Sequence, residues 1–165
     1  MPSDLAGLTV SVITVSDRRA AGAAEDTAGP AIAAAVRAAH GTATVTIVPD
    51  GLESVASAIV AARDAGAHII ISTGGTGVAP RDVTPEATAP LLAQQLPGLP
   101  ELLRREGAAS TPMAAVSRGL AGVTAGPRRA IVINLPGSER AAREGIATLL
   151  PLLGHLAAQV AGSDH

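Results

Sequence analysis

Short runs of apolar and β-branched residues recur along the chain, and each run predicts a β-strand. In Thr9–Ser16 nearly every position is apolar or β-branched, a pattern typical of a strand that is buried on both faces of its sheet. The other predicted strands are Thr42–Val48, Ala67–Ser72, Gly119–Thr124 and Arg129–Asn134. Ala125-Gly126-Pro127-Arg128 has the composition of a turn, so the last two strands are predicted to form a hairpin.

Between the strands, apolar residues recur at helical spacing. The clearest example begins at Leu52, where apolar positions mark one buried face before Gly66 ends the helix. Ser138 is predicted to cap the last helix, and Pro151 to kink or split it. The remaining predicted helices run from Gly29-Pro30 to about Ala39, from an N-cap at Thr84 to about Gln95, over Leu99–Glu106 and over Pro112–Ser117.

The order of the elements decides the fold class. Strands alternate with helices over most of the chain, which predicts a largely parallel sheet covered by helices, and the late hairpin adds one antiparallel strand. A length of 165 residues suits one compact domain with a proper core, and no internal repeat or low-complexity linker divides the chain. We therefore predict a single α/β domain over residues 1–165.

Composition and charge exclude several functional classes. A net charge of −2 argues against the basic face of a nucleic-acid-binding protein. The apolar run Leu8–Val15 is far too short to span a bilayer, so we expect no membrane association and a cytoplasmic protein. The chain has no Cys, which removes thiolate metal sites and cysteine nucleophiles, and no Lys, which excludes a P-loop nucleotidase. Because Phe, Tyr and Trp are also absent, a bound flat ring must rest on aliphatic side chains, backbone or Arg.

Polar or glycine-rich segments follow four of the predicted strands. In a parallel sheet, ligands bind beyond the carboxyl ends of the strands, so these loops are expected to meet along one edge. They are Ser16-Asp17-Arg18, Pro49-Asp50-Gly51, Ser72-Thr73-Gly74-Gly75-Thr76-Gly77 and Asn134-Leu135-Pro136-Gly137-Ser138. The third loop carries the strongest signal, because its glycines allow backbone N–H groups to approach a phosphate closely and its threonines add donors. Taken alone, a Gly-Gly-x-Gly turn is more often an ordinary strand-to-helix connection.

Two carboxylates lie where they can serve a phosphate. Asp50 and Asp82 are candidate magnesium ligands beside the glycine-rich loop, although a turn residue or a helix cap explains either of them alone. Asp17 either binds a ligand amine or pairs with an adjacent arginine. For Arg81 and for Ser117-Arg118, a phosphate contact and a surface role both stay open.

Together these segments resemble the molybdopterin-binding family, of the Mog/MoaB type of molybdenum-cofactor biosynthesis proteins. The stretch from the glycine-rich loop through Arg81-Asp82-Val83 to Thr84-Pro85-Glu86-Ala87 is long and specific, and it favours the phosphate interpretation of that loop. Other matching segments are Val15-Ser16-Asp17-Arg18, Pro49-Asp50, Leu96-Pro97-Gly98, Ala115-Val116-Ser117-Arg118 and Asn134-Leu135-Pro136-Gly137-Ser138. The resemblance covers about residues 8 to 158.

The resemblance implies a three-layer α/β/α molybdopterin-binding domain, a homotrimer and binding of molybdopterin. For the adenylyltransferase branch it implies a nucleotidyltransferase, for which ATP and the molybdopterin phosphate give adenylylated molybdopterin and pyrophosphate. The family's two key aspartates match Asp50 and Asp82, which we expect to hold Mg²⁺ and to act in catalysis. The expected contacts to pterin or nucleotide are Ser16, Asp17, Thr73, Gly74, Gly75, Thr76, Gly77, Thr84, Glu86, Ser117, Pro136, Gly137 and Ser138.

Two other functions remain open from the sequence. A non-catalytic module that binds or delivers molybdopterin needs the glycine-rich loop but not both aspartates as magnesium ligands. A molybdate-insertion module would take adenylylated molybdopterin in place of ATP. An adenylyltransferase would in turn hand its product to a molybdate-insertion enzyme.

Overall fold

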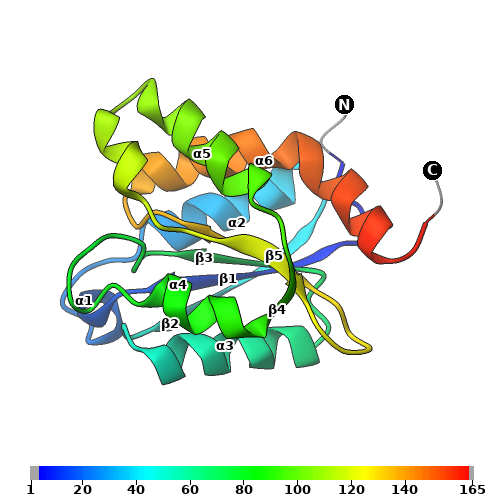
Figure 1. The fold of residues 1–165 in the computed structure, drawn as a ribbon, viewed down its shortest axis with the longest axis horizontal. Coiled ribbons are helices and arrows are strands. Elements are labelled where there is room, and N and C mark those ends of the chain that lie inside the picture. The colour runs from blue at the N-terminus through cyan, green and yellow to red at the C-terminus, as the bar shows by residue number, and fades with distance from the viewer. Residues whose placement is uncertain (1–3, 164–165) are drawn as a thin grey trace.

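A six-stranded sheet forms the centre of the molecule in the computed structural model, which describes residues 4–163 (Figure 1). Its strands lie in the order β2-β1-β3-β6-β5-β4. They are β1 (Thr9–Val15), β2 (Thr42–Val48), β3 (Ile69–Thr73), β4 (Leu92–Gln95), β5 (Ala121–Thr124) and β6 (Ile131–Leu135). β5 is antiparallel to both of its neighbours and the other pairs are parallel. The prediction of a mostly parallel sheet with one antiparallel strand is therefore confirmed.

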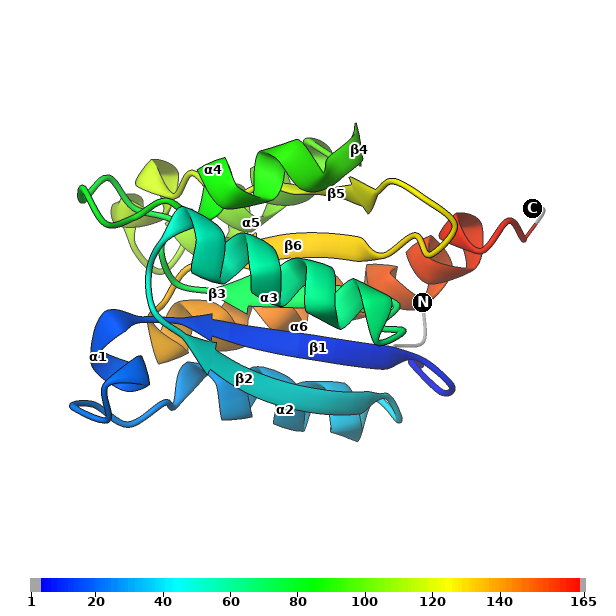
Figure 2. The same ribbon diagram turned by 90° about the horizontal axis from the view of Figure 1, so that it is seen from below.

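Helices cover both faces of this sheet (Figure 2). On one face lie α2 (Ala28–Ala38), α5 (Gly98–Ala108) and α6 (Glu139–Val160); on the other lie α3 (Leu52–Asp64) and α4 (Thr84–Thr88). Shorter pieces are α1 (Asp17–Ala20) and the 3₁₀ helices η1 (Ala89–Leu91) and η2 (Pro112–Val116). The three-layer α/β/α architecture is thus confirmed. Among residues 4–163 we find no helix with the length and apolar character that a bilayer crossing requires.

The central strands each serve two hydrophobic cores, because successive side chains of a strand point to opposite faces of the sheet. In β3, Ile69 and Ile71 belong to the core beneath α2 and α6, whereas Ile70 belongs to the core beneath α3. All three side chains are fully buried. Burial of one such side chain stabilises the fold by about 1.5–3 kcal/mol. β3 therefore packs against helices on both faces of the sheet. The residue at which the following loop begins is fixed in position by this packing.

The segment after the glycine-rich loop differs from the prediction. A helix to about Gln95 is wrong beyond α4, because the chain passes through η1 into β4, which pairs with β5. Pro90 cannot continue the helical hydrogen bonding, and pairing with a distant strand is not visible in the local pattern. Thr84 is also not the N-cap. It lies inside α4, whose N-cap is Val83, and its buried hydroxyl donates to the carbonyl oxygen of Gly74 at 3.0 Å.

The last helix, α6, continues through Pro151, so the predicted split is wrong. A proline inside a helix costs about 3 kcal/mol. Leu149 and Leu153, on either side of it, are fully buried, and each burial stabilises by about 1.5–3 kcal/mol. Packing therefore outweighs the local cost. The prediction that Ser138 caps this helix is confirmed, because its Oγ accepts the N–H of Ala141 at 3.2 Å.

Gly29 shows how closely α2 packs on the sheet. A Cβ at this position would lie 2.5 Å from both Thr14 Oγ1 and Asp26 Oδ2 and 2.9 Å from Val45 Cγ1. Helix propensity alone favours Ala by at most about 1 kcal/mol, whereas forcing a methyl group into a packed contact costs about 1–3 kcal/mol. We expect Gly29→Ala to lower the free energy of unfolding by about 1–2 kcal/mol in urea denaturation.

A matched control is Gly98→Ala at the start of α5. A Cβ there would meet nothing within 4 Å, so this variant should be as stable as the wild type or more stable. If Gly29→Ala unfolds at the same urea concentration as Gly98→Ala, the close contact between α2 and the sheet is contradicted.

Candidate functional site

The loops that follow β1, β2, β3 and β6 lie together at one edge of the sheet (Figure 2). Hydrogen bonds join them directly. The N–H of Asp17, after β1, donates to Oδ2 of Asp50, after β2, at 3.0 Å. Oγ1 of Thr73, at the end of β3, donates to the carbonyl oxygen of Pro136, after β6, at 2.7 Å. The structure therefore brings the four predicted loops into contact.

A cavity of about 740 Å³ opens between the glycine-rich loop and a wall formed by α5, η2 and the start of α6. Its size suits a small-molecule site, for which volumes of about 300–1,000 Å³ are usual. The predicted site residues that line it are Gly75, Thr76, Gly77, Asp82, Ser117, Pro136, Gly137 and Ser138. Those outside its lining are Ser16, Asp17, Asp50, Thr73, Gly74, Thr84 and Glu86.

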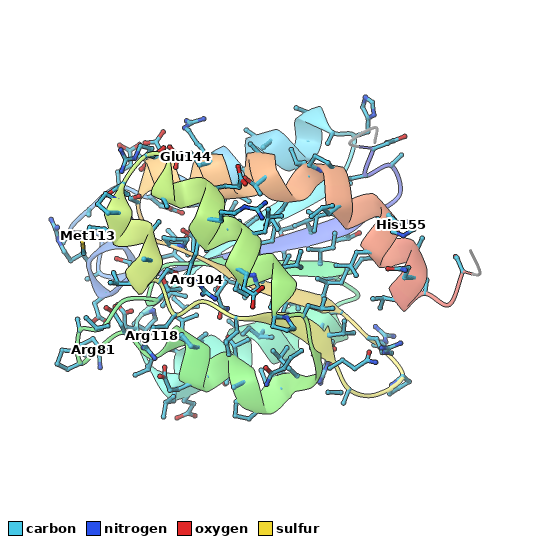
Figure 3. All side chains as sticks on the ribbon, turned by 45° about the horizontal axis from the view of Figure 1, so that its top comes forward. Arg81, Arg104, Met113, Arg118, Glu144 and His155 are labelled. Carbon is cyan, nitrogen blue, oxygen red and sulfur yellow. The ribbon has the colours of Figure 1, made fainter. Side chains whose placement is uncertain are left out.

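The far wall of the cavity carries residues that the sequence analysis missed, among them Arg104, Met113 and Glu144 (Figure 3). Nη1 of Arg104 donates to the carbonyl oxygen of Ser117 at 3.2 Å. Oγ of Ser110 donates to Oε1 of Glu144 at 2.7 Å, which connects the end of α5 to α6. No local motif marks these residues, because α5 and α6 meet only in the folded chain.

Two glycines of the loop are required by the packing of the chain itself. Gly74 has a φ of 107°, and a Cβ on it would lie 2.2 Å from the carbonyl oxygen of Val15. Gly75 has a φ of 68°, and a Cβ on it would lie 2.2 Å from Oγ1 of Thr84. Side chains are excluded at both positions. These glycines are therefore explained by the fold, with or without a ligand.

The backbone N–H groups of the loop are a stronger indication of a ligand. The N–H of Gly74 donates to the carbonyl oxygen of Leu135 at 3.0 Å. Within residues 4–163, no hydrogen bond uses the N–H groups of Gly75, Thr76 or Gly77, all of which line the cavity. Unpaired N–H groups at a cavity wall are donors for water or for an anion.

Asp82 follows this loop and is one of the residues that line the cavity. Its Oδ2 accepts the N–H of Ala79 at 3.1 Å, whereas no donor among the described residues bonds to its Oδ1. A Cβ on Gly77 would lie 2.7 Å from Oδ2. The missing side chain at Gly77 therefore leaves room for a carboxylate with one fixed oxygen and one free oxygen.

Asp17, Asp50 and Arg81 form a charged cluster beside the cavity. Arg81 donates to both carboxylate oxygens of Asp17, at 2.9 and 3.0 Å, and to the carbonyl oxygen of Asp50 at 2.7 Å. The N–H of Asp50 donates to Oδ1 of Asp17 at 3.1 Å. The Arg81 guanidinium holds the pKa of Asp17 below its ordinary value. Asp17 is thus occupied by a distant arginine, not by an adjacent one, and it fixes the backbone of Asp50.

Glu86 is paired with Arg118. The guanidinium of Arg118 donates to both carboxylate oxygens of Glu86, and this contact lowers the pKa of Glu86 from its ordinary value. The same guanidinium donates to the carbonyl oxygens of Gly77 and Asp82, each at 2.8 Å. Arg118, for which a phosphate contact and a surface role stay open from the sequence, thus contacts the loop itself.

Asn134 connects the site to the core beneath it. The residue is 2% exposed. Nδ2 donates to Oγ of Ser72 at 2.9 Å and to Oγ1 of Thr88 at 3.1 Å, and Oδ1 accepts the N–H of Leu120 at 3.0 Å. These bonds join β3, β6, α4 and the segment before β5. Both the oxygen and the nitrogen of the side-chain amide take part in them.

Two acidic residues, Asp82 and Asp50, are candidates for a metal site that a bound substrate would share. Within residues 4–163, no group of three or more His, Asp or Glu side chains is arranged to hold a metal ion. Mg²⁺ is commonly held by one or two carboxylates together with substrate phosphates and water. The free carboxylate oxygen of Asp82 at the cavity, with Asp50 beside the loop, fits that kind of site.

Comparison with known proteins agrees with this geometry. Residues 11–155 match the family described as a probable molybdopterin binding domain. The molybdenum cofactor biosynthesis bifunctional protein of Synechococcus elongatus is 46% identical over 162 residues, which are 98% of this chain and 50% of that protein. The chain thus spans about half the length of that relative. The molybdopterin adenylyltransferase of Pyrococcus furiosus is 35% identical over 147 residues, covering 88% of this chain and 86% of that one.

Among solved structures, that of a molybdopterin biosynthesis protein from Mycobacterium abscessus matches with a TM-score of 0.86 at 37% identity, covering 93% of this chain and 96% of that chain. The family match runs from β1 into α6 and includes all four loops of the site. The chain therefore belongs to the molybdopterin-binding domain family of molybdenum-cofactor biosynthesis proteins, of the Mog/MoaB type.

Proposed function

We propose that the protein is a molybdopterin adenylyltransferase, which transfers the adenylyl group of ATP to the terminal phosphate of molybdopterin. The observation that carries this proposal is the cavity at which unpaired N–H groups, the carboxylate of Asp82 and the N-terminus of α6 come together. Phosphate groups are the ligands that such donors favour. Relatives that bear the name molybdopterin adenylyltransferase support the choice of reaction.

In the proposed reaction, an oxygen of the molybdopterin phosphate forms a bond to the α-phosphorus of ATP. The bond from that phosphorus to the oxygen that bridges to the β-phosphate breaks, and its electron pair leaves with pyrophosphate. The attacking phosphate is largely ionised near pH 7, so no strong general base is needed. Catalysis then rests on positioning and on neutralisation of phosphate charge.

The cavity residues supply these two effects. The N–H groups of Gly75, Thr76 and Gly77 bind phosphate oxygens, and the start of α6 at Ser138 adds a second set of backbone donors. Asp82 and Asp50 would hold Mg²⁺, which when bound supplies Lewis-acid stabilisation of the charge on the phosphate oxygens.

Residues outside the cavity lining shape the loops. Oγ of Ser16 accepts the N–H of Arg19 at 3.2 Å and so caps α1. Thr73 and Thr84 each donate a side-chain hydrogen bond to a loop carbonyl oxygen. Asp17 and Arg81 hold the backbone of Asp50. Because their own chain occupies these groups, we assign them to the shape of the site and leave ligand contact to the cavity residues and to the carboxylate of Asp50.

The rings of the pterin and the adenine meet no aromatic side chain in this chain. The cavity wall instead offers aliphatic surface from Pro100, Leu103, Met113 and Val116. Flat rings therefore rest on methyl and methylene groups, and the absence of Trp and Tyr leaves pterin fluorescence free of protein background.

A variant that narrows the cavity tests its assignment. Ala141 lines the cavity in the first turns of α6, and Leu has a high helix propensity. We expect Ala141→Leu to keep the melting temperature but to weaken binding of molybdopterin or ATP by about tenfold or more, since overpacking costs about 1–3 kcal/mol. Ala158→Leu, on the exposed side of the same helix, serves as control. Wild-type affinity for both ligands in Ala141→Leu contradicts the assignment.

The sharpest test of the reaction is Asp82→Asn. An amide oxygen can still accept the N–H of Ala79, so the loop should keep its shape while its charge is lost. The variant should melt normally and bind molybdopterin, but adenylyl transfer, followed as pyrophosphate release, should fall by about a hundredfold or more. Asp50→Asn should act in the same direction if both carboxylates serve one ion.

Asp64→Asn, at the end of α3, is the matched control and should turn over at the wild-type rate. Melting, pterin affinity and pyrophosphate release are measured on one preparation. Normal turnover in a folded Asp82→Asn protein removes Asp82 from the mechanism. A wild-type protein that binds molybdopterin but releases no pyrophosphate favours the binding or delivery module.

We further propose a homotrimer, as the family resemblance implies. Exposed apolar side chains such as Val45, Ile47 and Leu52 provide surface for self-association. Sedimentation equilibrium at micromolar concentration should give three times the chain mass of 16.2 kDa. The mass of one chain in that experiment contradicts the trimer.

A further inference from the structure

Arg118 forms hydrogen bonds to the segment of residues 77–82, which contains Asp82. Its guanidinium makes four hydrogen bonds, two to the carboxylate of Glu86 and one each to the carbonyl oxygens of Gly77 and Asp82. Its backbone N–H donates to the carbonyl oxygen of Thr76 at 2.8 Å. One residue thus contacts both ends of the segment from residue 77 to residue 82.

This segment has few other attachments. Val78 is 78% exposed, and the two residues that follow it are exposed as well. Ala79 and Asp82 bond to each other through both of their backbone N–H groups, so these bonds shape the segment but do not fix its place. Within residues 4–163, the hydrogen bonds that tie it to other elements come from Arg118 on one side and from Arg81 on the other. Figure 3 shows both arginines at the end of the molecule where the loops meet.

We propose that Arg118, oriented by Glu86, is a positioning residue that fixes the Asp82 carboxylate at the cavity without touching a ligand. The proposal rests on the proposed function, in which Asp82 acts on the phosphates. It gives Glu86 a role as well, since the carboxylate of Glu86 sits on helix α4 and keeps the guanidinium turned toward the two carbonyl oxygens.

A direct phosphate contact by Arg118 is disfavoured by the same geometry. Arg118 is not among the residues that line the cavity, and its side chain already bonds to one carboxylate and two carbonyl oxygens. Four of the five N–H donors of the guanidinium are engaged in these bonds, so a bidentate contact with a phosphate would have to displace one of the partners. Arg118 bonds to the backbone carbonyl oxygen of Asp82 and not to its carboxylate. Arg118 therefore influences the position of the carboxylate through the backbone.

Substitution by lysine separates geometry from charge. Lys keeps the positive charge but presents a compact ammonium with three donors instead of a planar fork, so it cannot reproduce the four hydrogen bonds that the guanidinium makes to Glu86, Gly77 and Asp82. If Arg118 acts by position, Arg118→Lys should resemble Arg118→Gln and not the wild type. If it acts only as a charge, Arg118→Lys should be close to the wild type.

The first measurement is hydrogen exchange of backbone amides in the free protein. In Arg118→Lys and Arg118→Gln, the amides of Ala79 and Asp82 should exchange about tenfold faster or more, whereas the amide of Ala141 in α6 should be unchanged. This readout needs neither metal nor substrate. Unchanged exchange at Ala79 and Asp82 in both variants overturns the proposal.

The second measurement is adenylyl transfer at varied Mg²⁺ concentration. We expect the Arg118 variants to need about tenfold more Mg²⁺ for half-maximal rate or to lose about tenfold in kcat, while molybdopterin affinity stays within about twofold of wild type. Glu86→Gln should shift the same quantities less, and the double variant with Arg118→Gln should be no worse than Arg118→Gln alone. Wild-type values in Arg118→Lys overturn the proposal.

Arg143→Gln is the matched control, because Arg143 also forms an ion pair, through two hydrogen bonds to Oε1 of Glu139 on α6, away from the Asp82 segment. It should leave exchange and turnover unchanged, and a loss there equal to that of the Arg118 variants counts against a specific role of Arg118. A wild-type protein without pyrophosphate release refutes the adenylylation instead. In that case the amide exchange still decides whether Arg118 holds the segment.

Discussion

The buried amide of Asn134 is the contact on which the arrangement of the site depends. It joins β3, β6 and α4 under the cavity and also accepts the N–H of Leu120, where the chain turns into the antiparallel strand β5. A buried polar group left without a partner costs about 1–3 kcal/mol, so these four segments are held to one geometry. Thr88 extends the network to α4, since its own hydroxyl donates to the carbonyl oxygen of Thr84 at 2.8 Å.

Above this network, the loops are held by arginines. Arg81 bridges the loops after β1 and β2, and Arg118 bridges the glycine-rich loop and α4. Both use the planar fork of the guanidinium on carbonyl and carboxylate oxygens together, which an ammonium cannot reproduce. In a chain whose basic residues are all arginine, the cations near the site therefore serve largely as structural links. In the glycine-rich loop, the groups that stay unpaired among the described residues are the backbone N–H groups of Gly75, Thr76 and Gly77.

Much of the fold and part of the site follow from local sequence. The strand Thr42–Val48, the cap at Ser138 and the meeting of four loops at one edge are all visible in residue patterns, because they depend on side-chain periodicity and on the direction of parallel strands. β4 was not visible, because a four-residue strand exists through its partner β5. Arg104 and Glu144 were missed for a similar reason, since the wall they form joins α5 to α6 across the folded chain. Glu86 and Arg118 stand 32 residues apart, a separation at which no local rule pairs charges.

The topology of the sheet has a consequence for how the protein folds. Ile69 pairs with Ile131 and Val10 pairs with Ile69, so the two central ladders each close a loop of about sixty residues. Contacts this distant in sequence form slowly and late. Because the cavity needs both the loop after β3 and the loop after β6, its donors assemble only when the C-terminal third of the chain has docked. A nascent or truncated chain that ends before β6 can hold secondary structure, but it has no site to occupy. Ligand binding is thereby restricted to molecules that have completed their fold.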